Sequence, residues 1–180
     1  MPPILLFLSV ALRLSAAVSS CGPLPVPEAV SRAAIILHGR VERVVYLGPD
    51  GAAETPPRQN GRLCGPKLVT FTVTRLLKGV AADSVTAFAE DGCLYLGGYF
   101  REGEEYVAFT FPLSDGLGGA VASRYPVRAA TTSVPIATVL HVCGGTKRVG
   151  AANGGDLTAK GADAYMADIT ALLRAAPASR

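Results

Sequence analysis

The chain has 180 residues, with 17 basic and 14 acidic side chains and a formal net charge of +3. Charged residues make up 17% of the chain and are scattered along it, which excludes the strongly basic surface that nucleic-acid-binding proteins present. The four cysteines lie far apart in the chain, which excludes a C-x-x-C zinc site. Their even number indicates two disulfides in an oxidising compartment, and spacing alone leaves all three pairings open.

An apolar leader opens the chain. Residues 4–12 (ILLFLSVAL) are too few to span a bilayer, which requires about 20 residues. Small residues follow at 15–20 (SAAVSS), as they do before a signal-peptide cleavage site. We therefore expect residues 1–20 to be a signal peptide and the mature, secreted chain to begin at Cys21, although a cut after Ala17 fits nearly as well. No other apolar run is long enough to cross a membrane, so we expect no transmembrane segment.

The position of Cys21 allows a second interpretation. Residues 18–21 (VSSC) resemble the lipobox of bacterial lipoproteins, in which the cysteine thiol is acylated. However, residues 1–12 contain no Lys or Arg, whereas bacterial leaders usually begin with a positively charged region. Secretion is the favoured interpretation, and a lipid anchor on Cys21 is the alternative.

Three prolines and a short helical pattern begin the mature chain. Removal of residues 1–20 leaves 160 residues, enough for one domain with a hydrophobic core. Pro23, Pro25 and Pro27 keep this region extended, and Pro27 suits the first position of a short helix over Glu28–Ala33.

Apolar and β-branched residues predict five strands. These are Ile35–Leu47, Leu68–Leu77, Ser84–Ala89, Tyr106–Phe111 and Ile136–Val142. Gly39 inside the first strand predicts a bulge or sharp bend. Residues 48–66 are rich in Gly and Pro and predict a long surface loop that carries Cys64. Residues 144–156 are predicted to turn out of the sheet.

The chain closes with an amphipathic pattern. Apolar residues recur at helical spacing over Ala162–Leu173, which predicts a helix that packs on the sheet. Five strands separated by Gly/Pro-rich turns, with one short and one longer helix, predict an all-β fold with flanking helices, built as a small barrel.

Residues able to carry catalysis are scarce. The sequence has no P-loop, dinucleotide-binding or H-E-x-x-H motif, and two histidines. His38 lies in a predicted buried strand and is interpreted as a core or edge histidine. His141 and Cys143 would share a strand face, but a nucleophile needs a free thiolate and a disulfide removes it. We expect neither an enzyme nor a bound cofactor.

Charged and aromatic side chains receive structural interpretations. The acidic residues Glu102, Glu104 and Glu105 are interpreted as a solvated turn. Phenylalanines at strand positions are predicted to lie in the core rather than on a stacking surface. They are Phe71, Phe88, Phe100, Phe109 and Phe111.

A mature N-terminal cysteine offers chemistry of its own. Its free α-amine and its own carbonyl oxygen can close a five-membered chelate on a metal ion. The amine has a pKa near 8, so an appreciable fraction is neutral at physiological pH. A catalytic Zn²⁺ with three protein ligands keeps a position open for such donors. Cys21, anchored by a disulfide, could therefore occupy the catalytic zinc of another protein.

The order of several motifs resembles a known family. "CGPLPVPEAV", "AIILHGRV", "VTFTVTRLLKG", "CLYLGGYFREGEEYVAF" and "VLHVCGGTKRV" follow one another before the last helix. This layout, over about residues 21–175, resembles the N-terminal domain of the tissue inhibitors of metalloproteinases, a netrin-like module. The resemblance implies a monomeric five-stranded oligonucleotide/oligosaccharide-binding (OB) barrel over residues 21–176.

The resemblance also implies a site and a partner. Cys21 matches the zinc-chelating first residue, with Cys93 as its disulfide partner, which leaves Cys64 to pair with Cys143. The partner would be a zinc endopeptidase, whose zinc Cys21 would bind through its main chain. The contact ridge would consist of Cys21, Gly22, Pro23, Leu24, Gly92, Cys93 and Leu94.

Two departures from the family pattern support an alternative. Pro23 stands where the family usually has a second cysteine. Gly22 stands where the family normally offers a side chain to the specificity pocket of the protease, so contact area and specificity should be lost. The alternative function is a non-inhibitory netrin-like interaction or adhesion module that binds an extracellular matrix protein.

Overall fold

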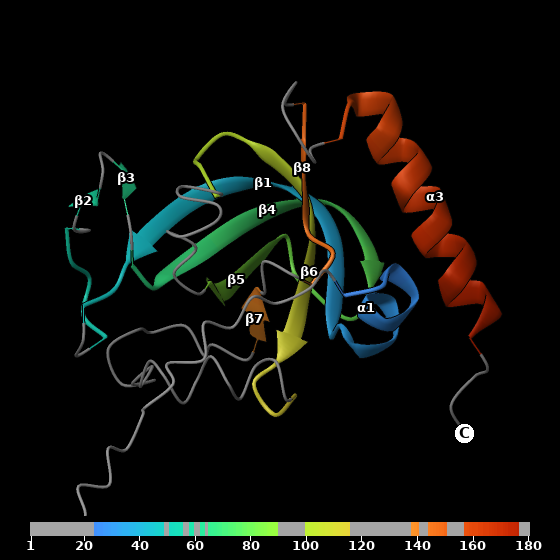
Figure 1. The fold of residues 1–180 in the computed structure, drawn as a ribbon, viewed down its shortest axis with the longest axis horizontal. Helices are drawn as coiled ribbons and strands as arrows, with labels where there is room; N and C mark the ends of the chain where they lie inside the picture. The colour runs from blue at the N-terminus through green and yellow to red at the C-terminus, as the bar shows by residue number, and fades with distance from the viewer. Residues whose placement is uncertain are drawn as a thin grey trace, which may run out of the picture.

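The computed structural model describes residues 24–48, 51–55, 58–59, 62–63, 65–89, 100–115, 138–140, 144–150 and 157–176. Within them the fold is mostly β, with two helices beside the sheet (Figure 1). The elements are α1 (Val26–Arg32), β1 (Ile35–Tyr46), β2 (Arg58–Gln59), β3 (Arg62–Leu63), β4 (Lys67–Lys78), β5 (Ser84–Ala89), β6 (Glu105–Pro112), β7 (Thr138–Leu140), β8 (Lys147–Val149) and α3 (Ala159–Ala175). Neither of these helices is long and apolar enough to cross a membrane.

The pairing of the strands defines the sheet. β1 pairs antiparallel with both β4 and β6, and β4 pairs antiparallel with β5. β5 runs parallel to β7, while β6 pairs antiparallel with β7 and β8. β2 and β3 form a separate two-stranded hairpin inside the segment predicted as a loop. The predicted β fold with a short helix before it and a longer one after it is confirmed.

β8 corrects one sequence interpretation. Residues 144–156 were predicted to turn out of the sheet, but Lys147–Val149 pair with Glu105–Val107 of β6. Three residues are too few to show a strand periodicity, so the sequence gives no signal for this strand.

The predicted irregularity at Gly39 is present. The register between β1 and β4 shifts between His38 and Gly39. A Cβ at Gly39 would lie 2.6 Å from the carbonyl oxygen of Thr72, closer than real Cβ atoms approach a backbone oxygen. The glycine therefore allows the two strands to approach each other where β1 changes register.

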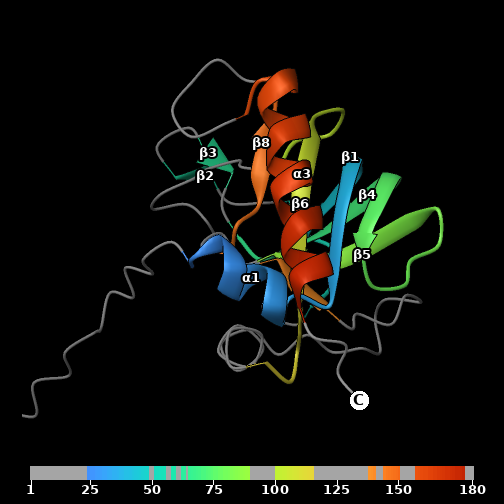
Figure 2. The same ribbon diagram turned by 90° about the vertical axis from the view of Figure 1, so that its right-hand side faces the viewer.

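Two apolar clusters account for most of the core. The first contains Phe71, Phe100 and Tyr106, whose rings meet with centroids 5.2–6.2 Å apart. The second lies between the sheet and the helices and includes Phe109 and Ile169. Figure 2 shows α1 and α3 on the same side of the molecule, in front of the sheet. All five phenylalanines predicted to lie in the core are buried.

α3 packs through the face that its sequence predicts. Its N-cap Thr158 accepts a hydrogen bond from the Gly161 amide at 3.1 Å, which satisfies one of the free donors of the first turn. Ala162, Met166 and Ile169 are buried and belong to the stripe that faces the sheet and α1. The helix extends a few residues beyond the predicted range at each end.

Candidate functional site

The predicted contact ridge is described at one position. Leu24 is half-buried and packs against the apolar cluster that includes Ala29 and Phe109. The other ridge residues and disulfide partners lie outside the described residues, as does the expected signal peptide over residues 1–20. They are Cys21, Gly22, Pro23, Cys64, Gly92, Cys93, Leu94 and Cys143. We use the name N-terminal segment for residues 21–34. The structure describes its last part, Leu24–Ala34, which we call the base of the N-terminal segment.

The helix in this base needs support from its neighbours. α1 begins at Val26 after the N-cap Pro25, so Pro27 lies one position later in the helix than predicted. Glu28 in the first turn and Arg32 in the last turn suit the helix dipole. A helix of seven residues is not stable alone in water, so tertiary contacts must hold it.

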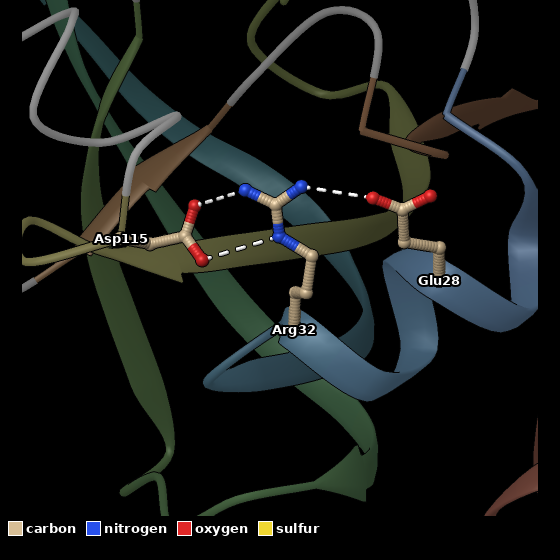
Figure 3. Close-up of polar contacts among 3 residues, drawn as sticks. All are labelled: Glu28, Arg32 and Asp115. Carbon is tan, nitrogen blue, oxygen red and sulfur yellow. Dashed lines mark hydrogen bonds and ion pairs between the residues drawn. The ribbon is translucent and has the colours of Figure 1, made fainter.

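Arg32 ties α1 to the chain that follows β6 (Figure 3). Its Nη2 and Nε donate to the two carboxylate oxygens of Asp115 at 2.6 and 3.2 Å, and its Nη1 donates to Glu28 at 3.0 Å. The Asp115 side chain is 17% exposed, so this bidentate pair is partly shielded from water. The fork geometry fixes orientation as well as distance. The end of α1 is thus fixed to a residue 83 positions away.

The turn after position 143 packs against the same helix. Gly145 has φ +92° and its carbonyl oxygen accepts a hydrogen bond from the Tyr165 hydroxyl at 2.8 Å. A Cβ at Gly145 would lie 3.5 Å from both Ala29 and the ring of Phe109. Next to it, Thr146 Oγ1 accepts a buried hydrogen bond from the Phe109 amide at 3.0 Å. Burial raises the pKa of Tyr165 to about 12.

Three strand ends form one row across the sheet. Lys67 at the start of β4 pairs with Ala89 at the end of β5, and Ala89 pairs with Leu140 at the end of β7. β4 runs antiparallel to β5, and β5 runs parallel to β7. The start of β4 and the ends of β5 and β7 therefore lie at the same end of the sheet. We call these three residues the strand-end row.

The acidic turn is exposed at Glu102, as its sequence suggests, whereas Glu104 is part-buried and has side-chain partners. The buried Tyr106 hydroxyl donates to Glu104 at 2.8 Å, and Arg148 Nη1 lies 3.4 Å from the same carboxylate. Burial, followed by the hydrogen bond to Glu104, raises the pKa of Tyr106. The Glu102 carboxylate accepts from the Val44 amide at 2.9 Å. The interpretation therefore holds for the exposed Glu102 and not for Glu104, which contacts the neighbouring Tyr106 and the distant Arg148.

Glu105 likewise has partners on β1. Its carboxylate accepts from Arg40 Nη2 at 3.0 Å and lies 3.5 Å from His38 Nε2. The His38 side chain is 16% exposed on β1, which pairs on both sides, so it is a core rather than an edge histidine. Within the part of the chain that the structure describes, its buried Nε2 has no hydrogen-bond partner. His141 lies outside the described residues. Among those that are described, no group of three His, Cys, Asp or Glu side chains could hold a metal ion.

Comparisons with known proteins do not supply a family. No family model, characterised protein or solved structure matches the chain. The site must therefore be judged on its own contacts and chemistry.

Proposed function

We propose that the chain is a secreted metalloprotease inhibitor-like protein, in which the amine and carbonyl oxygen of Cys21 chelate the catalytic zinc of a target endopeptidase. The supporting observation is that Leu24, three residues after Cys21 in the sequence, packs on the apolar core and is followed by a helix held by Arg32 and Asp115. A short segment on a fixed base has little conformational freedom to lose on binding, which favours insertion into a narrow cleft.

The proposal includes closure of the sheet into an OB barrel. Two pairings support it: β1 contacts both β4 and β6, and the parallel pair of β5 and β7 joins the two halves of the sheet. Followed in space, the pairings run β1-β4-β5-β7-β6 and return to β1. A closed barrel leaves few free strand edges, which suits a protein exposed outside the cell.

The strand-end row brings together the starts of the segments that carry Cys64, Cys93 and Cys143, which the proposed disulfides Cys21–Cys93 and Cys64–Cys143 require, as the other pairings do. Cys64, Cys93 and Cys143 each stand three or four residues from a member of that row. An extended chain of four residues reaches at most about 14 Å, so the three chain segments that carry these cysteines begin within one row of paired residues. Each proposed disulfide would close a loop of more than 70 residues and contribute on the order of 4 kcal/mol in the chain-entropy model. Peptide mapping without reduction tests the pairing, and a Cys21–Cys64 peptide would disprove it.

The start of the mature chain is the first experimental requirement. Chelation needs an unblocked α-amine, so N-terminal sequencing and intact mass of the secreted protein should give a chain that starts at Cys21 without a modification. A start at Val18, or an acylated cysteine as in the lipid-anchor alternative, leaves no donor at the required position and contradicts the proposal.

Inhibition itself is tested against a panel of zinc endopeptidases. The native protein should inhibit at least one member. The Gly22→Thr variant should inhibit it more strongly, since a side chain would fill a specificity pocket that glycine leaves empty. A Gly22→Thr variant with unchanged potency would show that this residue does not face the pocket.

The alternative function is a non-inhibitory netrin-like module that binds an extracellular matrix protein. It is favoured by two features of the sequence, Gly22 without a side chain and Pro23 in place of a second anchoring cysteine. Absence of inhibition across the panel, together with saturable binding to a matrix component, would support it over the inhibitor.

A further inference from the structure

The end of β4 contacts the junction between α1 and β1, which we define as residues Val30–Ala34. Lys78 is the last residue of β4 and pairs with Ile36 of β1. Its Nζ donates to the carbonyl oxygens of Val30 at 2.7 Å and Ser31 at 2.9 Å. The last carbonyls of a helix have no partner within the helix, and a cation there satisfies them and complements the helix dipole.

Gly79 completes the contact. It has φ +88°, a conformation that side chains disfavour, and a Cβ there would collide with the carbonyl oxygen of Ala34. The absence of a side chain at Gly79 thus allows the turn after β4 to pack directly against the junction. The adjacent pair Lys78–Gly79 contacts both ends of the junction, through Val30 at one end and Ala34 at the other.

This contact differs in kind from the others that hold α1. Arg32 fixes the helix through its own side chain, and Ala29 through apolar packing. Lys78 binds main-chain oxygens, so it acts on the path of the backbone whatever side chains the helix carries. It is half-buried, and burial lowers the pKa of its ammonium group, so its stem and charge are partly withdrawn from water.

We propose that Lys78 and Gly79 are positioning residues that set the orientation of α1, and with it of Leu24, relative to the sheet. They hold the junction, the junction fixes the axis of α1, and α1 directly follows Leu24 and Pro25. The effect on inhibition rests on the proposed function, whereas the effect on the junction does not.

Amide hydrogen exchange in the full-length protein tests the positioning directly. The Ala33 amide donates to Ala29 and the Ala34 amide donates to Thr110, so both report on the junction. Lys78→Met keeps the apolar stem and removes the charged donor. It should speed exchange at these two amides about tenfold, the size expected for loss of a charge-assisted hydrogen bond, and leave β4 core amides unchanged. Lys78→Arg should restore most of the protection.

Matched variants and inhibition separate the two claims. Arg75→Met removes an exposed cation from the same strand and should change neither amide. Unchanged exchange in Lys78→Met, or a rise spread equally over β4, would overturn the positioning role. If the native protein inhibits, Lys78→Met should inhibit more weakly, and equal potency would also overturn it. If the native protein inhibits nothing, the proposed function fails, and the exchange data still decide the role of Lys78.

Discussion

Replacement of Ile169 by alanine measures how firmly α3 is docked. Ile169 is fully buried in the cluster that joins α3 to Ile36 of β1 and Phe109 of β6. The change removes three carbon groups, at about 0.8 kcal/mol for each buried CH₂, which gives about 2.4 kcal/mol. The cavity left behind raises the expected loss in unfolding free energy into the range of about 2–5 kcal/mol.

Urea unfolding and thermal melting read out this loss. For a domain of this size, each kcal/mol lowers the Tm by about 2–4 °C, so a loss near 3 kcal/mol should lower it by about 6–12 °C. Asp168→Ala is the matched control, since Asp168 is exposed on the same helix and its removal should change stability by no more than about 0.5 kcal/mol. A loss below about 1 kcal/mol for Ile169→Ala would refute the docking of α3 on the sheet.

Three further predictions concern the turn that packs against α1. Burial raises the pKa of Tyr165 above its unfolded value near 10, so its stabilising contribution is complete below about pH 10 and is lost as the pH rises toward 12. Over that window the native protein should lose stability more steeply than the Tyr165→Phe variant. Equal slopes of stability against pH would contradict this. Thr146→Val removes the buried acceptor of the Phe109 amide and should cost about 1–3 kcal/mol in urea unfolding, whereas Thr146→Ser should cost less; equal losses would count against the hydrogen bond. Gly145→Ala introduces a side chain at φ +92° and should destabilise by at least about 1 kcal/mol, so a neutral result in thermal melting would contradict the turn geometry.

Local periodicity predicted the elements well. The alternation in β4 places Val69 and Phe71 on one face, and both are fully buried. The helical spacing in α3 likewise identifies Met166 and Ile169 as buried residues. These patterns succeed because burial of a strand or helix face depends on residues two to four positions apart, which the sequence displays directly.

Contacts between distant elements were not predictable in the same way. Nothing near Arg32 indicates Asp115, and nothing near Glu104 indicates Arg148. A run of acidic residues has the same sequence pattern whether it faces water or a buried partner. The base of the N-terminal segment is built from such contacts, so the sequence predicts its position but not what holds it.

Selective acetylation of the α-amine of Cys21 is the most direct test of zinc chelation. The acetylated nitrogen has no lone pair available to a metal, while the apolar core that stabilises the fold keeps all its side chains, so the fold should be unaffected. The measurement is the inhibition constant against a zinc endopeptidase that the native protein inhibits, with the Tm of both forms as a control for folding. The account predicts that acetylation abolishes inhibition at an unchanged Tm, and equal inhibition by the native and acetylated forms would contradict it.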